Sequence, residues 1–397
     1  MNTLNNHFFA ERISHDVAGI RISAIKEMAI LSAGMGNVAS LTWGLPSFET
    51  PEYIRKGVIQ RLQQDPDIGK YTLPDGLKDL REIVAKQHSA ETGIAVDADD
   101  QVMITAGNMQ GLNTLFQIIT NPGDEIILTD PCFASHIQQI RLCACSPRFW
   151  PLDEARHWDL DIERLPELIN AKTKAIVIVT PSNPTGKIFR KDELIRLGEI
   201  ARQHKLMILI DNPYHHFTYE NKDLYYNLAS NQDFFDHIIY CFSFSKSYAM
   251  SGWRLGYMVL PDHLKEQSLK VHDANMICAP RISQVAGIIA LKEKSNHIAE
   301  FEAVLSKRRE LICQRLAEVP HVFEYHKPEG AYYVFPKIVA DHTNAYDFSI
   351  RLLNEAKVAL TPGSAFGPSG EHHVRMAYCV PEDVINLAFD RIQAYFK

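Results

Sequence analysis

Short runs of apolar residues recur along the chain without the alternation of polar and apolar positions that marks a half-buried strand. They are rich in Val, Ile and Leu and predict strands buried on both faces, at 101–106, 125–129, 175–180, 206–210, 237–242 and 256–260. Amphipathic stretches with helical spacing separate several of these runs, at 109–119, 134–141 and 192–204. This alternation predicts an α/β fold in which helices flank a mainly parallel central sheet.

The pattern changes after residue 292. A long amphipathic stretch predicts a helix at 296–318, and the rest of the chain predicts a strand, a helix, a strand and a closing helix at 331–335, 346–356, 374–378 and 381–396. We therefore expect two domains. A large α/β domain covers 48–292, and a smaller α+β domain is built from 1–47 and 293–397.

The composition narrows the class of protein. The 397 residues are 46% hydrophobic and 22% charged, and 48 acidic residues outnumber 41 basic ones. That balance argues against a nucleic-acid partner, which binds through clustered Lys and Arg. Residues 1–7 lack the features of a signal peptide, and the apolar runs are far shorter than the ~18 residues of a membrane helix. Seven irregularly spaced cysteines indicate reduced thiols, so we expect a cytoplasmic enzyme that does not bind a membrane.

A lysine comes shortly after the predicted strand 237–242. Lys246 ends the string Ser243-Phe244-Ser245-Lys246, and eight residues later Arg254 lies between two glycines, at 252 and 256. This arrangement suits a Schiff-base lysine, with Ser243, Ser245 and Arg254 gathered around a phosphate group. Taken singly, the two charged residues are more often an ordinary loop lysine and a structural arginine.

Three more strand ends carry polar residues. Asp211-Asn212-Pro213-Tyr214, Ser182-Asn183-Pro184-Thr185-Gly186 and Thr105-Ala106-Gly107-Asn108-Met109-Gln110 each follow a predicted strand. Alone, each string reads as a cap, a turn or a weak anion site at a helix start. Together they offer a lysine, an aspartate, a tyrosine, an asparagine, an arginine and a phosphate-accepting helix start. That inventory suits a phosphorylated aldehyde cofactor whose ring nitrogen needs an acidic partner.

These motifs and their order resemble the class I/II aminotransferases, which are pyridoxal 5'-phosphate enzymes of fold type I. The resemblance extends over nearly the whole chain. Its motifs are Gly44-Leu45-Pro46, Tyr71-Thr72-Leu73-Pro74-Asp75-Gly76, Gly107-Asn108-Met109, Ser182–Gly186, Asp211–Tyr214, Ser243–Lys246 with Arg254, and Val374-Arg375.

The resemblance implies a role for each residue near the cofactor ring. Lys246 would bind the cofactor covalently and shuttle the proton, and Asp211 would keep the ring nitrogen protonated. Tyr214 and Asn183 would hydrogen-bond the phenolic oxygen of the ring. Phe133 would stack on the ring, although a phenylalanine at this place also suits the core.

The resemblance also implies the phosphate and substrate sites. The residues expected around the phosphate are Gly107, Asn108, Met109, Ser243, Ser245 and Arg254. Arg375 would clamp the substrate α-carboxylate, with Gly44 and Asn183 beside it. Tyr71 would reach the phosphate of the neighbouring subunit, which implies a homodimer with shared active sites; the alternative is a tyrosine that packs within its own chain. A cis peptide bond is expected at Asn183–Pro184.

Two positions depart from aspartate-preferring relatives. Some of those carry a lysine where this chain has Met109, and others bring an arginine from the partner subunit where it has His272 and Asp273. A second substrate carboxylate without a cation would stay desolvated and unpaired. We therefore expect an amino donor with a neutral, aromatic or basic side chain. A preference for aspartate would require another cation, such as Arg21 or Arg281.

Two pairs of adjacent histidines have no role in these motifs. His215-His216 and His372-His373 lack the spacing and the partners of a metal site. We expect residues of the active-site rim or the surface, and no metal.

The leading hypothesis is an aminotransferase that moves an amino group from an L-amino acid to a 2-oxo acid by a ping-pong mechanism. A C–S lyase, a decarboxylase or an oxidase is the alternative, because small changes in the pocket select the bond that the same cofactor breaks. A non-enzymatic cofactor-binding regulator is the minor alternative, since Lys246 and Arg375 are both present.

Overall fold

The central sheet runs in the strand order β2-β8-β7-β6-β5-β3-β4 through the part of the chain described by the computed structural model, residues 12–397 without 21, 294 and 341–342. Its strands are β2 (Val102–Thr105), β3 (Glu125–Asp130), β4 (Ser146–Pro151), β5 (Thr173–Ile178), β6 (Met207–Asp211), β7 (Ile238–Ser243) and β8 (Gly256–Val259). Strand β8 is antiparallel to both of its neighbours, and all other pairs are parallel. The predicted mainly parallel sheet is therefore confirmed.

Strand β4 was not predicted from the sequence. It lies at the edge of the sheet beside β3 and contains Pro147 and Pro151. Proline cannot donate to a strand ladder, so it is tolerated at a sheet edge and hides such a strand from an apolar pattern.

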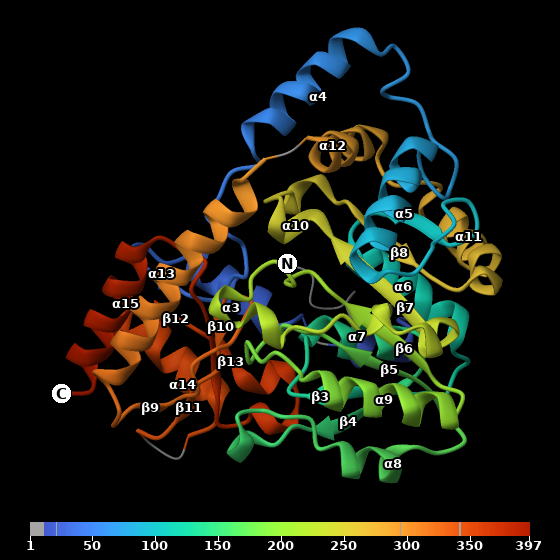
Figure 1. The fold of residues 1–397 in the computed structure, drawn as a ribbon. Helices are drawn as coiled ribbons and strands as arrows, with labels where there is room; N and C mark the ends of the chain where they lie inside the picture. The colour runs from blue at the N-terminus through green and yellow to red at the C-terminus, as the bar shows by residue number, and fades with distance from the viewer. Residues whose placement is uncertain (1–11, 21, 294, 341–342) are drawn as a thin grey trace.

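Helices cover both faces of the sheet (Figure 1). On one face lie α5 (Lys78–Thr92), α9 (Lys191–Gln203) and α12 (Arg281–Lys292), and on the other lie α6 (Asn108–Ile119), α7 (Ala134–Leu142) and α11 (Asp262–Met276). Successive residues of one strand enter opposite cores: Ile208 and Ile210 face the first set of helices and Leu209 faces the second. This explains why the strands read as continuous apolar runs.

The C-terminal part forms a second hydrophobic core with its own helices and short strands. It contains α13 (His297–Ala317), α14 (Ala345–Arg351), which continues into the π-helix η7 (Leu352–Ala356), α15 (Glu382–Tyr395), β9 (Phe323–Glu324), β10 (Tyr333–Val334), β11 (Lys337–Ile338), β12 (Val358–Ala359), β13 (Thr361–Pro362) and β14 (Val374–Ala377). The predicted strand at 331–335 is thus shorter than expected, and it pairs with β14.

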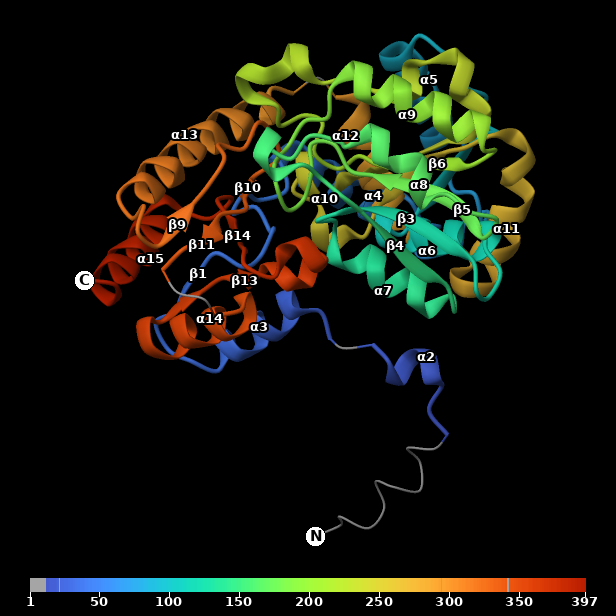
Figure 2. The ribbon, with the colours of Figure 1, turned by 90° about the horizontal axis from the view of Figure 1, so that it is seen from below.

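An N-terminal segment joins this second core. Strand β1 (Ala39–Ser40) pairs in parallel with β12, and α3 (Ala24–Ala33) lies beside α14 (Figure 2), where Tyr346 Oη donates to Glu27 Oε1 over 2.9 Å. We keep the division into 48–292 and 1–47 with 293–397 as a proposal, since these contacts are compatible with it.

The remaining helices are short or lie at the margin of the sheet. They are α2 (His15–Ala18), α4 (Glu52–Gln64), α8 (Leu165–Leu168), α10 (Phe244–Ser247), and the 3₁₀ helices η1 (Glu154–Arg156), η2 (Ile162–Arg164), η3 (Tyr219–Leu224), η4 (Leu228–Ser230), η5 (Gln232–His237), η6 (Ser251–Trp253), η8 (Gly363–Phe366) and η9 (Pro368–Gly370).

Within the described ranges, no helix combines the length and the apolar character needed to span a bilayer. All seven cysteines are free thiols. The N-terminal residues 1–7, on which the absence of a signal peptide was judged, lie outside the described residues.

Candidate active site

The polar motifs meet at one edge of the central sheet. Asp211 ends β6, Asn183 follows β5, and Lys246 lies in α10 directly after β7, so three neighbouring strands point their carboxyl ends at the same place. Because β8 runs antiparallel to β7, the start of β8 brings Arg254 to this edge as well. Carboxyl ends of parallel strands are where open α/β sheets bind ligands.

The carboxylate of Asp211 is buried and held by two side chains. Its Oδ1 accepts a 2.7 Å hydrogen bond from Nδ2 of Asn108, and its Oδ2 lies 3.1 Å from Nε2 of His136. Asn108 is predicted at the phosphate as part of the start of α6, and its side chain also holds Asp211. His136 was missed, although a histidine three residues after Phe133 on the buried face of a predicted helix is a detectable signal. Phe133 itself is half-buried, with its ring edge-on to His136 at 5.3 Å.

The guanidinium of Arg254 lies beside the backbone at the start of α6. Gly107 has φ of 76°, and a Cβ there would lie 2.7 Å from Nη2 of Arg254, so glycine allows the guanidinium to approach the backbone. Nη1 of Arg254 donates to the backbone oxygen of Ser251 over 2.9 Å. Ser243 caps α10 by accepting a hydrogen bond from the backbone N–H of Ser245. Two hydroxyls, a guanidinium and a helix N-terminus are the groups that hold a phosphate.

Lys246 is half-buried, and its Nζ donates a 2.7 Å hydrogen bond to the backbone oxygen of Gly44. Burial lowers the pKa of this amine to about 8, with a further lowering by the charge of Arg375. A useful fraction of the amine is therefore neutral near pH 7, and only the neutral form is nucleophilic.

Arg375 is buried on β14. Its Nη1 donates to Oδ1 of Asn183 over 3.0 Å, and its Nη2 donates to the backbone oxygen of Thr42. The guanidinium carbon lies 4.5 Å from the ring centre of Tyr333 and 4.9 Å from that of Phe366. The Asn183–Pro184 peptide bond is cis, as predicted.

Two tyrosines of this site were not predicted. Tyr333 Oη lies 3.0 Å from the hydroxyl of Tyr214, and Tyr332 donates to the backbone oxygen of Gly44 over 3.2 Å. The sequence pattern placed both residues in a core strand, and they are buried there. Their contacts join segments more than a hundred residues apart, which a local pattern does not reveal.

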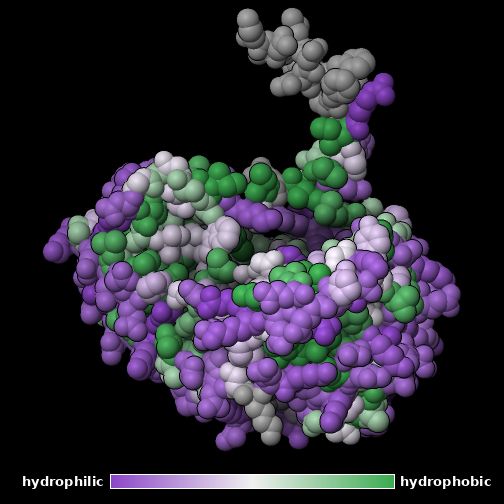
Figure 3. Space-filling view, turned by 90° about the horizontal axis from the view of Figure 1, so that it is seen from above, coloured by the Kyte–Doolittle hydropathy of each residue, from purple (hydrophilic) through white to green (hydrophobic). Residues whose placement is uncertain are grey.

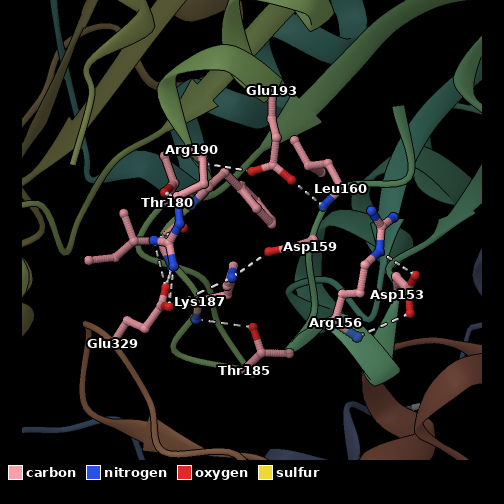
Figure 4. A network of polar contacts seen from close by, with 12 residues as sticks. Asp153, Arg156, Asp159, Leu160, Thr180, Thr185, Lys187, Arg190, Glu193 and Glu329 are labelled. Carbon is pink, nitrogen blue, oxygen red and sulfur yellow. Dashed lines mark hydrogen bonds and ion pairs between the residues drawn. The ribbon is translucent and has the colours of Figure 1, made fainter. Parts of the chain in front are cut away.

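An ion-pair network fastens the loop that carries Asn183 (Figure 4). Lys187, only 4% exposed, lies 2.5 Å from Oδ1 of Asp159 and 3.7 Å from Oε1 of Glu329, and Arg190 pairs with the same glutamate. The backbone N–H groups of Glu329 and Gly330 donate to the carbonyl of Gly186. The network thus fixes the Asn183 loop against the segment that leads into Tyr332 and Tyr333.

Tyr71 lies in a loop, 74% exposed. The side chain is thus mostly unburied by its own chain, and its contact with a neighbouring subunit stays a prediction. Met109, the second residue of α6, has 37% of its surface exposed. Figure 3 shows the molecule from above. The face seen in this view has a hollow near its middle, bordered by hydrophobic and hydrophilic side chains.

The histidines need one correction. His373 was expected at the rim or surface, but it is buried, because its ring stacks on Phe335 and its Nε2 pairs with Glu154 over 3.0 Å. His372 is exposed and His215 is half-buried, while the Nδ1 of half-buried His216 lies 2.8 Å from Oγ of Ser247.

The structure describes three of the positions considered for binding a second substrate carboxylate, His272, Asp273 and Arg281. His272 is fully buried in α11, where its Nδ1 contacts Nε2 of Gln110 over 3.1 Å, and its neighbour Asp273 is acidic. Arg281 lies 3.8 Å from Asp65. Arg21 lies outside the described residues.

Comparison with known proteins decides the family. The family model described as aminotransferase class I and II matches residues 37–392. The chain belongs to the class I and II aminotransferases. It is a transaminase of fold type I, and members of this family use pyridoxal phosphate and act on amino acids and 2-oxo acids.

Its relatives in this aminotransferase family carry different substrate names. The chain is similar to aromatic-amino-acid aminotransferase 2 of Thermococcus litoralis, with 33% identity over 94% of this chain and 96% of that protein. It is similar to the aspartate aminotransferase of Pyrococcus abyssi, with 32% identity over 94% and 96%. The solved structure of an aromatic aminotransferase from Pyrococcus horikoshii superimposes with a TM-score of 0.86 at 30% identity and covers 93% of this chain and 98% of that one.

Proposed function

We propose that this aminotransferase binds pyridoxal 5'-phosphate at the sheet edge described above, with Nζ of Lys246 joined to the aldehyde carbon of the cofactor. One observation carries the proposal: Lys246, Asp211 and Asn183 follow three neighbouring strands at one edge of the sheet, where the start of β8 also brings Arg254. The donor set fits the cofactor, since it offers one carboxylate for the ring nitrogen and a cradle beside Gly107 for the phosphate.

The surrounding residues orient the cofactor. Asp211, held by Asn108 and His136, would pair with the ring nitrogen and keep it protonated. Tyr214 and Asn183 would donate to the phenolic oxygen, and Phe133 would stack on the ring. The residues that would hold the phosphate are Gly107, Asn108, Met109, Ser243, Ser245 and Arg254. When bound, the cofactor supplies an electron sink for the bonds at the substrate α-carbon.

The substrate is an L-amino acid, held by its α-carboxylate. Arg375 binds that carboxylate bidentately, with Gly44 and Asn183 beside it. Nζ of Lys246 would take the proton from the α-carbon and deliver it again. A 2-oxo acid then accepts the amino group in the second half of a ping-pong cycle.

We further propose a donor with a neutral, aromatic or basic side chain over aspartate and glutamate. Met109 offers no charge at the start of α6, and His272 is fully buried in α11. The names of the relatives do not decide this point, because they include both aspartate and aromatic aminotransferases.

The proposed assembly is a homodimer in which Tyr71 completes the neighbouring active site. A tyrosine that is mostly exposed and belongs to a cofactor motif needs a partner surface. Other large apolar side chains are exposed as well: Ile59, Leu62, Leu73 and Ile277. Exposed apolar side chains can be buried at an interface between two subunits.

Spectroscopy of the first half-reaction tests the function. An amino donor alone, without 2-oxo acid, should deplete the absorbance of the Lys246-bound cofactor and release the matching 2-oxo acid in a single turnover. Release of a thiol, carbon dioxide or hydrogen peroxide instead would show a lyase, a decarboxylase or an oxidase.

A further inference from the structure

Tyr333 contacts three residues of the proposed site, yet no role has been assigned to it. It lies in β10 with its side chain 1% exposed. Its hydroxyl meets Tyr214, its ring meets Arg375, and its oxygen fills the space beside Gly44.

The first contact joins two hydroxyl groups. The oxygens of Tyr333 and Tyr214 are 3.0 Å apart, and no other side chain among the described residues hydrogen-bonds the hydroxyl of Tyr214. Burial raises the pKa of Tyr333 to about 12 and that of Tyr214 well above its usual value, so both groups are protonated at neutral pH. One proton lies between the two oxygens. When Tyr333 donates it, the proton of Tyr214 is left to point at the ring oxygen of the cofactor.

The second contact supports the substrate clamp. The guanidinium carbon of Arg375 lies 4.5 Å from the ring centre of Tyr333, a distance at which an aromatic face attracts a cation. Among the described residues, Nε of Arg375 has no hydrogen-bond partner, so the ring contact helps to fix its plane.

The third contact explains a glycine. A Cβ at residue 44 would lie 1.8 Å from Oη of Tyr333, and only glycine leaves room for the hydroxyl. The Gly44 backbone, whose oxygen accepts from Lys246, is thereby packed against the same tyrosine.

We propose that Tyr333 is a positioning residue that sets the hydroxyl of Tyr214 and the guanidinium of Arg375 together. One side chain would then align the group that tunes the cofactor and the group that holds the substrate. The proposal rests on the proposed function, which gives Tyr214 and Arg375 their ligands. The other titratable and charged groups around the two tyrosines are Tyr332, Arg375, Asp211, Lys246 and Cys379.

Two substitutions separate the contact of Tyr333 with Tyr214 from its contact with Arg375. Tyr333→Phe removes the hydroxyl and keeps the ring. Without the hydroxyl of Tyr333, Tyr214 would be a weaker and less well oriented donor to the ring oxygen, so the absorbance transition of the Lys246-bound cofactor should move to higher pH by about 0.5 unit or more. We expect kcat to fall about tenfold and KM for the amino donor to change less than about threefold. Tyr333→Leu also removes the ring, and KM should then rise about tenfold as well.

Tyr325→Phe is the matched control. It removes a partly buried hydroxyl outside the proposed site, which donates to the backbone oxygen of Cys313 over 2.9 Å. The absorbance transition of the Lys246-bound cofactor should stay at its wild-type pH. A Tyr333→Phe enzyme with the wild-type transition and kcat would overturn the proposal, even if it melted at a lower temperature. A wild-type protein without a pH-dependent absorbance from Lys246-bound cofactor would overturn the proposed function itself, so the two failures are distinguishable.

Discussion

Asn108 donates a 2.7 Å hydrogen bond to Asp211, a residue 103 positions further along the chain. The bond ties the first turn of α6 to the end of β6, and with it the proposed phosphate site to the proposed partner of the ring nitrogen. His136 holds the second oxygen of the same carboxylate. A carboxylate fixed at both oxygens is aimed before the cofactor binds.

The Asn108→Ala variant tests this arrangement. It removes a hydrogen bond to a buried charge, and we expect kcat to fall about ten- to a hundredfold. Asn170→Ala is the matched control, since Nδ2 of Asn170 donates to the carboxylate of Glu125 over 2.8 Å at an exposed place. Steady-state kinetics of the two variants should differ by at least the lower figure. Equal kcat values would show that Asp211 needs no support from Asn108.

The lowered pKa of Lys246 predicts how the protein captures its cofactor. Below a pKa of about 8 the neutral fraction of the amine falls tenfold per pH unit. The rate at which the cofactor-free protein forms the covalent link should therefore rise about tenfold per unit up to pH 8 and level off above it. Stopped-flow absorbance measures this rate. A rise that continued to pH 10 would indicate a lysine with its ordinary pKa.

We expect the uncharged side chain of Met109 and the burial of His272 to determine which amino donor is preferred. A neutral or aromatic amino acid should exceed aspartate by at least about tenfold in kcat/KM, or about 1.4 kcal/mol, because the second carboxylate lacks a charge-assisted hydrogen bond. A panel of amino acids in the first half-reaction measures this ratio. Met109→Lys should raise the value for aspartate selectively. If aspartate were the best donor of the unmodified enzyme, another cation, such as Arg281, would have to supply the clamp.

The ion-pair network around Lys187 predicts a stability effect. Glu329→Gln removes the negative charge that pairs with the buried ammonium group of Lys187 and with Arg190. We expect the free energy of unfolding to fall by about 1–3 kcal/mol. This is less than for a fully buried pair, because Glu329 is partly exposed. Glu310→Gln is the control, because its pair with Lys327 is half exposed and worth about 0–1 kcal/mol. Urea titration compares the two. Equal midpoints would show that the network does not stabilise the fold.

The gathering of polar site residues at the carboxyl ends of the strands was predictable from the sequence. Lys246, Asp211 and Asn183 each follow an apolar run, and parallel strands bring their carboxyl ends together without further information. The runs were detectable because Val, Ile and Leu fill both faces of each strand. Strand β4 escaped because two prolines interrupt its pattern at the sheet edge.

The contacts between distant segments were not predictable. Tyr214 and Tyr333 are 119 positions apart, and His136 and Asp211 are 75 apart. Their pairing depends on how the C-terminal core and α7 pack beside the sheet. The burial of His373 was not predictable for the same reason. Its ring packs against Trp158 and its Nε2 pairs with Glu154, and both partners lie far from it in the sequence.

The attachment of the cofactor is the central claim, and mass spectrometry tests it most directly. The protein would be loaded with pyridoxal 5'-phosphate, reduced with borohydride, digested and sequenced, with a Lys246→Ala variant treated in parallel. We expect a phosphopyridoxyl group on Lys246 and none on any peptide of the variant, which should still bind the cofactor non-covalently and lack turnover. A modified lysine elsewhere in the native protein, or ordinary transamination by the variant, would contradict the account.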